Sequence, residues 1–122
     1  MNLQRLVRIV AIGVTCAVWL FSLMPVTLTI PGGDKLHHLL AYAGLMLMWR
    51  LAIPAATVRT QATLAALIML MGIAIEFAQA LTPHRTFEWA DAAANAVGVF
   101  IGWIVATLWL RFAPKRGFTR AV

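Results

Sequence analysis

Apolar residues along this chain gather in four long runs. The runs cover about residues 6–24, 36–53, 62–81 and 89–112. A helix needs about 20 mostly apolar residues to span the hydrocarbon core of a bilayer. Each run is followed closely by a proline, which cannot continue a helix, and these prolines are Pro25, Pro54, Pro83 and Pro114. The pattern predicts four transmembrane helices.

No strict alternation of apolar and polar residues, the pattern of a strand, interrupts these runs. We therefore predict an all-α protein, an integral membrane four-helix bundle with a single transmembrane domain over residues 1–122. The chain is 62% hydrophobic and 11% charged, whereas soluble domains carry about 25% charged residues. The first run has the basic start of a signal peptide, but no small-residue cleavage site follows in "SLMPVTL", so we expect it to remain a helix.

Basic residues are distributed unevenly between the two predicted sides of the membrane. One side carries Arg5, Arg8, Arg50, Arg59, Arg111, Lys115, Arg116 and Arg120, and the other carries Lys35 and Arg85. Because cytoplasmic loops carry the excess of Lys and Arg, both termini are predicted to be cytoplasmic. The net charge of +6 then reflects topology and attraction to anionic lipids. We expect no nucleic-acid partner, since the basic residues are dispersed around apolar spans.

The chain has only four acidic residues, and all of them fall toward the outer side under this topology. They are Asp34, Glu76, Glu88 and Asp91. Glu76 lies seven residues before Pro83, which places it roughly 10 Å below the outer loop at the rise of an α-helix. A carboxylate at that depth costs several kcal/mol unless it is paired or faces a wet cavity. Other helices must therefore supply a partner.

Polar residues recur at helical spacing in three of the predicted helices. These residues are Asp34, His38 and Tyr42 in the second run, Glu76 and Gln79 in the third, and Asp91 and Asn95 in the fourth. Residues three or four apart share one face of a helix, so three polar faces are expected at similar depth. Gly98 and Gly102 continue the last of them with a G-x-x-x-G spacing that admits another helix, including one from a homodimer partner.

These polar residues also form ordered motifs. The segment "DKLHHLLAY" (34–42) contains D-K-x-x-H-x-x-x-Y, and "EFAQALTPHRTFEWADAAANAVG" (76–98) contains E-x-x-Q, P-x-R and D-x-x-x-N-x-x-G. On these motifs, over about two thirds of its length, the chain resembles the VanZ-like family. The matching residues are Asp34, Lys35, His38, Tyr42, Glu76, Gln79, Pro83, Arg85, Asp91, Asn95 and Gly98.

The resemblance implies a multi-pass protein of the bacterial inner (cytoplasmic) membrane. The family is named for a member associated with low-level resistance to the glycopeptide teicoplanin, and no catalytic mechanism belongs to its motifs. We predict an outward-facing polar cluster that binds an amphiphilic cell-envelope ligand, such as a lipid-linked or peptidoglycan-related molecule. The expected ligand-binding residues are Asp34, Lys35, His38, Tyr42, Glu76, Gln79, Arg85, Asp91 and Asn95.

For His38, Glu76 and Arg85 the sequence allows both a functional and a structural role. His38 is a candidate for proton transfer or a structural histidine bonded to Glu76 or Asp91. Glu76 is a candidate general acid or base, or one half of an ion pair with Arg85 or Lys35. Arg85 has the planar fork that binds phosphate or carboxylate, or it neutralises an acid. If the protein is an enzyme, His38 and Glu76 are its catalytic candidates.

Metal binding has weaker support from the sequence. Asp34, His38, Glu76 and Asp91 offer suitable ligand atoms, but they come from three helices and no spacing demands a metal. We expect neither a metal nor another cofactor. The only cysteine, Cys16, excludes an intramolecular disulfide and fits a small packing residue.

Three functions remain compatible with the sequence. The first is the binding of membrane lipids or of a lipid-linked ligand. The second is an enzyme that acts on a lipid head group or lipid-linked precursor, although Cys16 and Ser22, on the first helix, place no serine or cysteine nucleophile near the cluster. The third is a structural membrane subunit whose polar network sets helix register. A closed, fully paired network favours the third, and unpaired groups around a cavity favour the first two.

Overall fold

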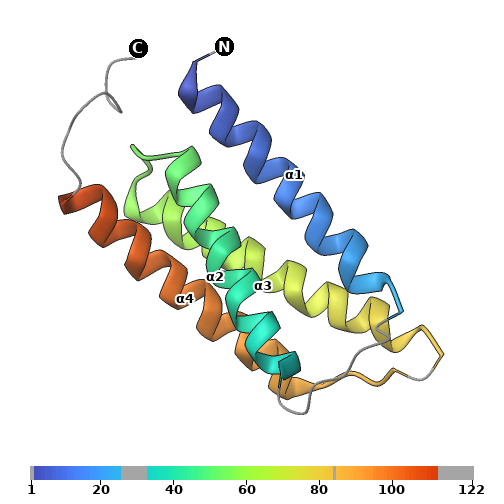
Figure 1. Ribbon diagram of the computed structural model, residues 1–122. Helices are drawn as coiled ribbons and strands as arrows, with labels where there is room; N and C mark the ends of the chain where they lie inside the picture. The colour runs from blue at the N-terminus through green and yellow to red at the C-terminus, as the bar shows by residue number, and fades with distance from the viewer. Residues whose placement is uncertain (1, 26–32, 84, 113–122) are drawn as a thin grey trace.

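The computed structural model describes residues 2–25, 33–83 and 85–112, which form four α-helices and no strand (Figure 1). The helices are α1 (Leu3–Leu23), α2 (Gly33–Ala52), α3 (Val58–Ala80) and α4 (Trp89–Phe112). They alternate in direction, so α1 and α3 begin at the end of the bundle where α2 and α4 finish (Figure 1). The predicted all-α four-helix bundle is confirmed.

Polar capping residues extend two helices beyond their apolar runs. Thr57 accepts a hydrogen bond from the backbone N–H of Thr60, so α3 begins at Val58 rather than near residue 62. Asn2 caps α1 in the same way by accepting from Arg5. Side-chain oxygens at this position satisfy backbone donors that have no partner within the helix. Hydropathy alone does not register these polar first turns.

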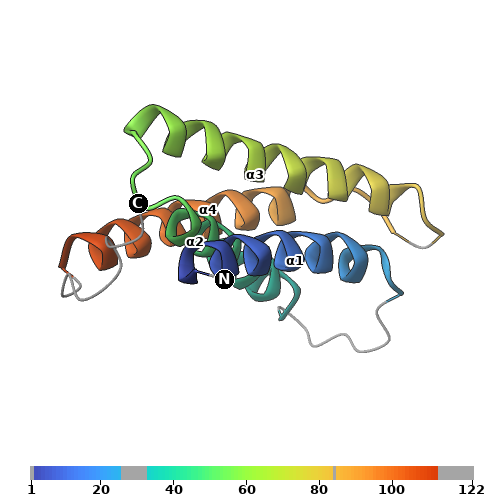
Figure 2. The same cartoon turned by 90° about the horizontal axis from the view of Figure 1, so that it is seen from above.

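The second helix occupies the centre of the bundle. α2 packs against α1, α3 and most extensively α4, whereas the described parts of α1 and α4 do not touch. Figure 2 shows α1 and α3 running along different sides of the α2–α4 pair. At the end where α1 and α3 finish, they meet through a hydrogen bond from Gln79 to the carbonyl oxygen of Ser22. Side chains on different faces of α2 therefore reach three neighbours.

The contact between α2 and α4 depends on two glycines of α4. A Cβ atom at Gly98 would collide with the carbonyl oxygen of Leu39, and one at Gly102 would collide with that of Ala43. The G-x-x-x-G face is thus buried against α2 of the same chain. A homodimer stays a prediction, but one through Gly98 and Gly102 would have to displace α2.

Apolar residues fill the centre and also cover the outside. The buried cluster consists of Tyr42, Leu45, Met46, Ala65, Ile68 and Val99. Large apolar side chains such as Phe21, Leu70 and Phe100 are more than half exposed. Exposed apolar surface on this scale is typical of a membrane-embedded protein rather than a soluble monomer.

Three of the described helices, α1, α3 and α4, are long and apolar enough to cross a membrane. α2 does not reach the same apolar character, because Asp34, Lys35, two histidines and Arg50 lie within its 20 residues. The ionisable residues at the start of α2, noted in the sequence, account for this difference. Asp34 and Lys35 are exposed at that end, whereas Arg50 is buried near the other end.

Candidate functional site

His38 of α2 lies where α2, α3 and α4 meet. Its Nδ1 atom is 3.0 Å from Oδ1 of Asn95 and 3.8 Å from Oε1 of Glu76. Its Nε2 atom is 3.6 Å from Oδ1 of Asp34 and 3.8 Å from Oδ2 of Asp91. The i, i+4 spacing of Asp34 and His38 places both on one face of α2. One imidazole therefore contacts acidic or amide groups from three helices.

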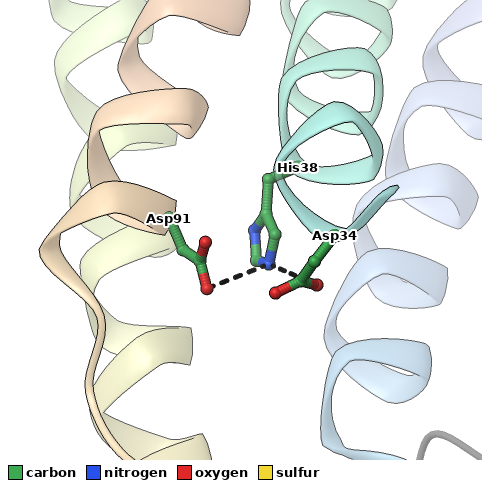
Figure 3. A group of neighbouring side chains, drawn as sticks. All are labelled: Asp34, His38 and Asp91. Carbon is green, nitrogen blue, oxygen red and sulfur yellow. Dashed lines mark ion pairs between the residues drawn. The ribbon is translucent and has the colours of Figure 1, made fainter. Parts of the chain in front are cut away.

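The hydrogen bond to Asn95 determines which nitrogen of His38 carries the proton. The amide oxygen of Asn95 can only accept, so Nδ1 donates to it across 3.0 Å. In the neutral ring Nε2 then has a lone pair rather than a proton. Nε2 faces the carboxylates of Asp34 and Asp91, with which a protonated ring forms ion pairs, as Figure 3 shows. The arrangement gathers one imidazole nitrogen and two carboxylate oxygens around one point.

Lys35 ties the outer ends of α2 and α4 together. Its ammonium lies 2.8 Å from Oδ1 of Asp91 and 3.0 Å from Oε2 of Glu88. Asp91 is buried, whereas Glu88 and Lys35 are exposed. Asp91 thus uses one oxygen for Lys35 and turns the other toward His38. The predicted site did not include Glu88, although its spacing of three residues before Asp91 was a usable signal.

Glu76 is almost completely removed from solvent. The residue is 1% exposed, and its Oε1 atom has no hydrogen-bond partner. The described residues contain no ion pair between Glu76 and either Arg85 or Lys35, which the sequence had offered as partners; His38 lies nearest among the basic groups. The deep carboxylate predicted from the sequence is therefore sheltered inside the bundle and remains incompletely satisfied.

Tyr42 lies one turn deeper on the face of α2 that carries His38. Its hydroxyl is buried without a hydrogen-bond partner. A Cβ at Gly72 of α3 would be 3.0 Å from Cε1 of Tyr42 and 2.9 Å from Nδ2 of Asn95. The missing side chain at Gly72 lets α3 approach both residues. Buried polar groups normally find partners, so this unsatisfied hydroxyl marks a network that is not closed.

A cavity of about 580 Å³ opens between α1 and the polar face of α2. Its polar wall includes Asp34, His38, Tyr42, Gln79 and Arg85. Its apolar wall comes mainly from Val14, Ala17, Val18 and Phe21 of α1, and Ala41 of α2 adds to it. Ligand pockets commonly have volumes of about 300–1,000 Å³ and few polar groups on apolar walls. The size and the lining fit a small amphiphilic molecule.

Gln79 and Arg85 converge on the end of α1. Both donate to the carbonyl oxygen of Ser22, at 2.7 Å from Nε2 of Gln79 and 3.2 Å from a terminal nitrogen of Arg85. Ser22 itself lines the cavity. The sequence had placed this serine away from the cluster, because nothing in its local pattern indicates which helix its end approaches. Both hydrogen bonds use the backbone carbonyl of Ser22 and not its hydroxyl.

The structure brings every predicted ligand-binding residue into one of two adjoining groups. Around His38 lie Asp34, Lys35, Glu76, Asp91 and Asn95. Along the cavity lie Asp34, His38, Tyr42, Gln79 and Arg85. Asp34 and His38 belong to both groups and connect them. Together the groups offer cationic and acidic positions next to an apolar wall.

The chain is similar to a known protein family. Residues 2–110 match the family model described as VanZ/LLP1. No curated protein and no solved structure matches the chain. The matched region contains α1, α2, α3, all but the last two residues of α4, and both groups of polar residues. Because the match covers far more than half of the sequence, the chain belongs to the VanZ/LLP1 family of membrane proteins.

Proposed function

We propose that this VanZ-like protein resides in the bacterial inner membrane and binds an amphiphilic cell-envelope ligand in the cavity between α1 and α2. The observation that supports this function is that the cavity has one apolar wall and one polar wall. Val14, Val18 and Phe21 offer an apolar surface, and Arg85 stands with polar groups at the other side. A molecule with an acyl or prenyl tail and a polar head would satisfy both walls.

The chemistry of the head group follows from Arg85. The guanidinium has five N–H donors, and its only recorded bond among the described residues is to the carbonyl oxygen of Ser22. A planar fork of this kind binds phosphate or carboxylate through two parallel hydrogen bonds. A phosphate-bearing head is therefore the preferred ligand, as in a phospholipid or a lipid-linked peptidoglycan precursor. The carboxylate of Asp34 is largely exposed and would accept hydrogen bonds from hydroxyl or amino groups of the ligand.

The distribution of basic residues supports an outward-facing cavity. Arg5 and Arg59 lie near the starts of α1 and α3, and Arg111 lies at the end of α4. These positions share one end of the bundle (Figure 1), whereas Asp34 and Asp91 start α2 and α4 at the opposite end. By the positive-inside rule the arginine-rich end is cytoplasmic, so both termini would be inside and the cavity would open on the outer side.

The unpaired groups favour binding over a purely structural network. Oε1 of Glu76 and the hydroxyl of Tyr42 are buried without partners, whereas a network that only sets helix register should be fully paired. An enzyme acting on a lipid head group remains the alternative. What favours it is His38, a group suited to proton transfer, whose Nδ1 lies 3.8 Å from the buried carboxyl of Glu76.

The test is native mass spectrometry of lipids that remain bound to the purified wild-type protein and to Arg85→Gln. We expect a specific phosphate-bearing lipid on the wild type and its severalfold loss in Arg85→Gln. Arg59→Gln is the matched control, because this exposed arginine lies at the other end of the bundle. Equal retention by both variants would contradict the assignment of Arg85, and chemical conversion of the lipid by the wild type would establish the enzyme instead.

A role in glycopeptide (teicoplanin) resistance belongs to the same hypothesis. Cells that express the wild type should tolerate more teicoplanin than cells that express Arg85→Gln at equal protein level. Equal tolerance would separate ligand binding from resistance.

A further inference from the structure

We propose that Asp34, His38 and Asp91 form a binding site for a divalent transition-metal ion such as Zn²⁺ or Mn²⁺. Each residue offers one ligand atom, and these atoms all lie within 4.8 Å of one another. Figure 3 shows the three side chains converging from α2 and α4. Imidazole with carboxylate oxygens is a ligand set suited to zinc or manganese. The site does not depend on the lipid proposed for the cavity.

The hydrogen bond between His38 and Asn95 orients the imidazole ring for metal coordination. Nδ1 donates to Asn95, so Nε2 is the nitrogen that faces the two carboxylates. A cation compensates carboxylates held this close together, and either a proton on Nε2 or a metal ion bound in its place supplies that charge. A hydrogen bond that fixes the tautomer of the far nitrogen is also the usual outer support of a metal-binding histidine. Asn95 of α4 is the hydrogen-bond acceptor that would support His38 in this way.

Glu76 supplies a second, independent observation. Its side chain is 2% exposed, and Oε1 lacks a hydrogen-bond partner while lying 3.8 Å from Nδ1 of His38. Coordination of a dication at Nε2 would draw electron density from the ring and make its Nδ1 side more positive. The buried carboxylate would then face a favourable charge. Carboxylate groups behind a metal-bound histidine have this role in other metal sites.

The local charge also permits a dication. Asp34, Asp91 and Glu88 provide three carboxylates at this end of the bundle, and Lys35 provides one ammonium that is bonded to two of them. These three carboxylates and one ammonium have a net charge of about −2 when they carry their usual charges at neutral pH. Lys35 neutralises one oxygen of Asp91 and leaves the other directed toward His38.

Binding a metal ion requires one side chain to move. In the tetrahedral geometry of zinc, bonds of about 2.0–2.2 Å place two ligand atoms roughly 3.3–3.6 Å apart. The ligand atoms here are within 4.8 Å, and the side chain of Asp34 is 64% exposed, so it can rotate inward. Asp34 and His38 also line the cavity. Coordination positions not taken by protein would therefore face the cavity, where water or an anionic head group could bind.

The test measures metal binding to the full chain in detergent, purified with a tag that contains no histidine. Zn²⁺ affinity is measured by calorimetry, and Co²⁺ absorption reports nitrogen coordination. We expect about one metal ion per chain in the wild type and at least a roughly tenfold weaker affinity in His38→Ala. His37→Ala is the matched control and should bind as the wild type does, because this exposed neighbour is outside the ligand set.

Asp34→Asn keeps the test decisive if His38→Ala does not fold. Asp34 is exposed, so its replacement leaves the buried network in place, and the same loss of affinity is expected. No metal binding by the wild type would overturn the site, as would wild-type affinity in Asp34→Asn. Arg85→Gln should bind metal normally, which separates failure of this site from failure of the proposed lipid binding.

Discussion

The two long faces of α2 are packed in different ways. Toward α4, Gly98 and Gly102 bring the helix backbones so close that no side chain fits between them. Toward α1, the same helix borders a cavity of about 580 Å³. The close face determines the geometry of the His38 cluster, and the open face gives that cluster access to a ligand. Rigidity and access are thus provided by different neighbours of one helix.

The attachment of α1 explains how the open face is maintained. Near the start of α1, Gln4 and Arg8 donate to carbonyl oxygens at the end of α2, and Trp49 donates to Thr15 across 3.0 Å. At the other end, Ser22 accepts bonds from α3 and from the segment before α4. The cavity is lined by the second half of α1, from Val14 to Ser22. α1 is therefore bonded to α2 as far as Thr15, whereas its end is bonded to α3 and to the segment before α4.

The largest loss of stability is expected from a substitution that blocks the close contact between α4 and α2. Gly98→Val would place side-chain atoms against the backbone of Leu39, and backbone cannot yield as a flexible side chain can. We expect a loss of roughly 3 kcal/mol or more, the upper range for overpacking, together with loss of metal and lipid binding. Thermal unfolding in detergent measures it. Gly44→Ala is the control, because nothing lies within 4 Å of its added Cβ; similar melting of both variants would refute the close contact.

A smaller effect, on lipid binding rather than on stability, is expected from filling the cavity between α1 and α2. Ala17 lines the cavity, and Ala17→Phe would occupy part of the apolar wall. We expect a severalfold loss of bound lipid with little change in melting temperature, because the new ring enters space that is already present. Native mass spectrometry compares it with Ala66→Phe, which changes an exposed alanine of α3. Unchanged lipid retention in Ala17→Phe would place the ligand elsewhere.

The smallest effect concerns one attachment of α1. Thr15→Val removes the acceptor of the Trp49 indole N–H, and interhelical bonds of this kind in membranes contribute about 0.6 kcal/mol on average. We expect a slight fall in melting temperature and a change in tryptophan fluorescence. Thr63→Val is the matched control, because Thr63 bonds only to the carbonyl of its own helix. An equal response of the two variants would argue against this attachment.

Much of the candidate site could be predicted because helical spacing is a local property. Asp34 and His38 are four residues apart, as are Asp91 and Asn95, so each pair shares a face whatever the remainder of the chain does. The depth of Glu76 follows from its distance to Pro83. The sequence offered three partners for Glu76, which were His38, Arg85 and Lys35, and it did not decide between them; in the structure His38 lies beside it. Side-chain charge indicates a need for compensation but not the direction from which it comes.

Long-range contacts explain the residues that were missed or misassigned. Ser22 reaches the cavity because α1 finishes beside Gln79 and Arg85, and Glu88 joins the cluster because Lys35 extends to it from α2. The G-x-x-x-G pattern predicted a close helix neighbour, and this neighbour is α2 of the same chain. Sequence spacing identifies the residues on one side of a contact between helices, but it does not show which helix forms the other side.

By itself, the amino-acid sequence determined the four helices, the family and the polar face of each helix, because hydropathy and the period of the helix act over short distances. Only the tertiary structure decided which faces meet. A cavity separates part of α1 from α2, and the contact of α4 with α2 directs Asp91 and Asn95 to His38. These choices depend on the packing of whole helices against one another, where small differences in side-chain volume, such as the glycines of α4, set the distance between elements.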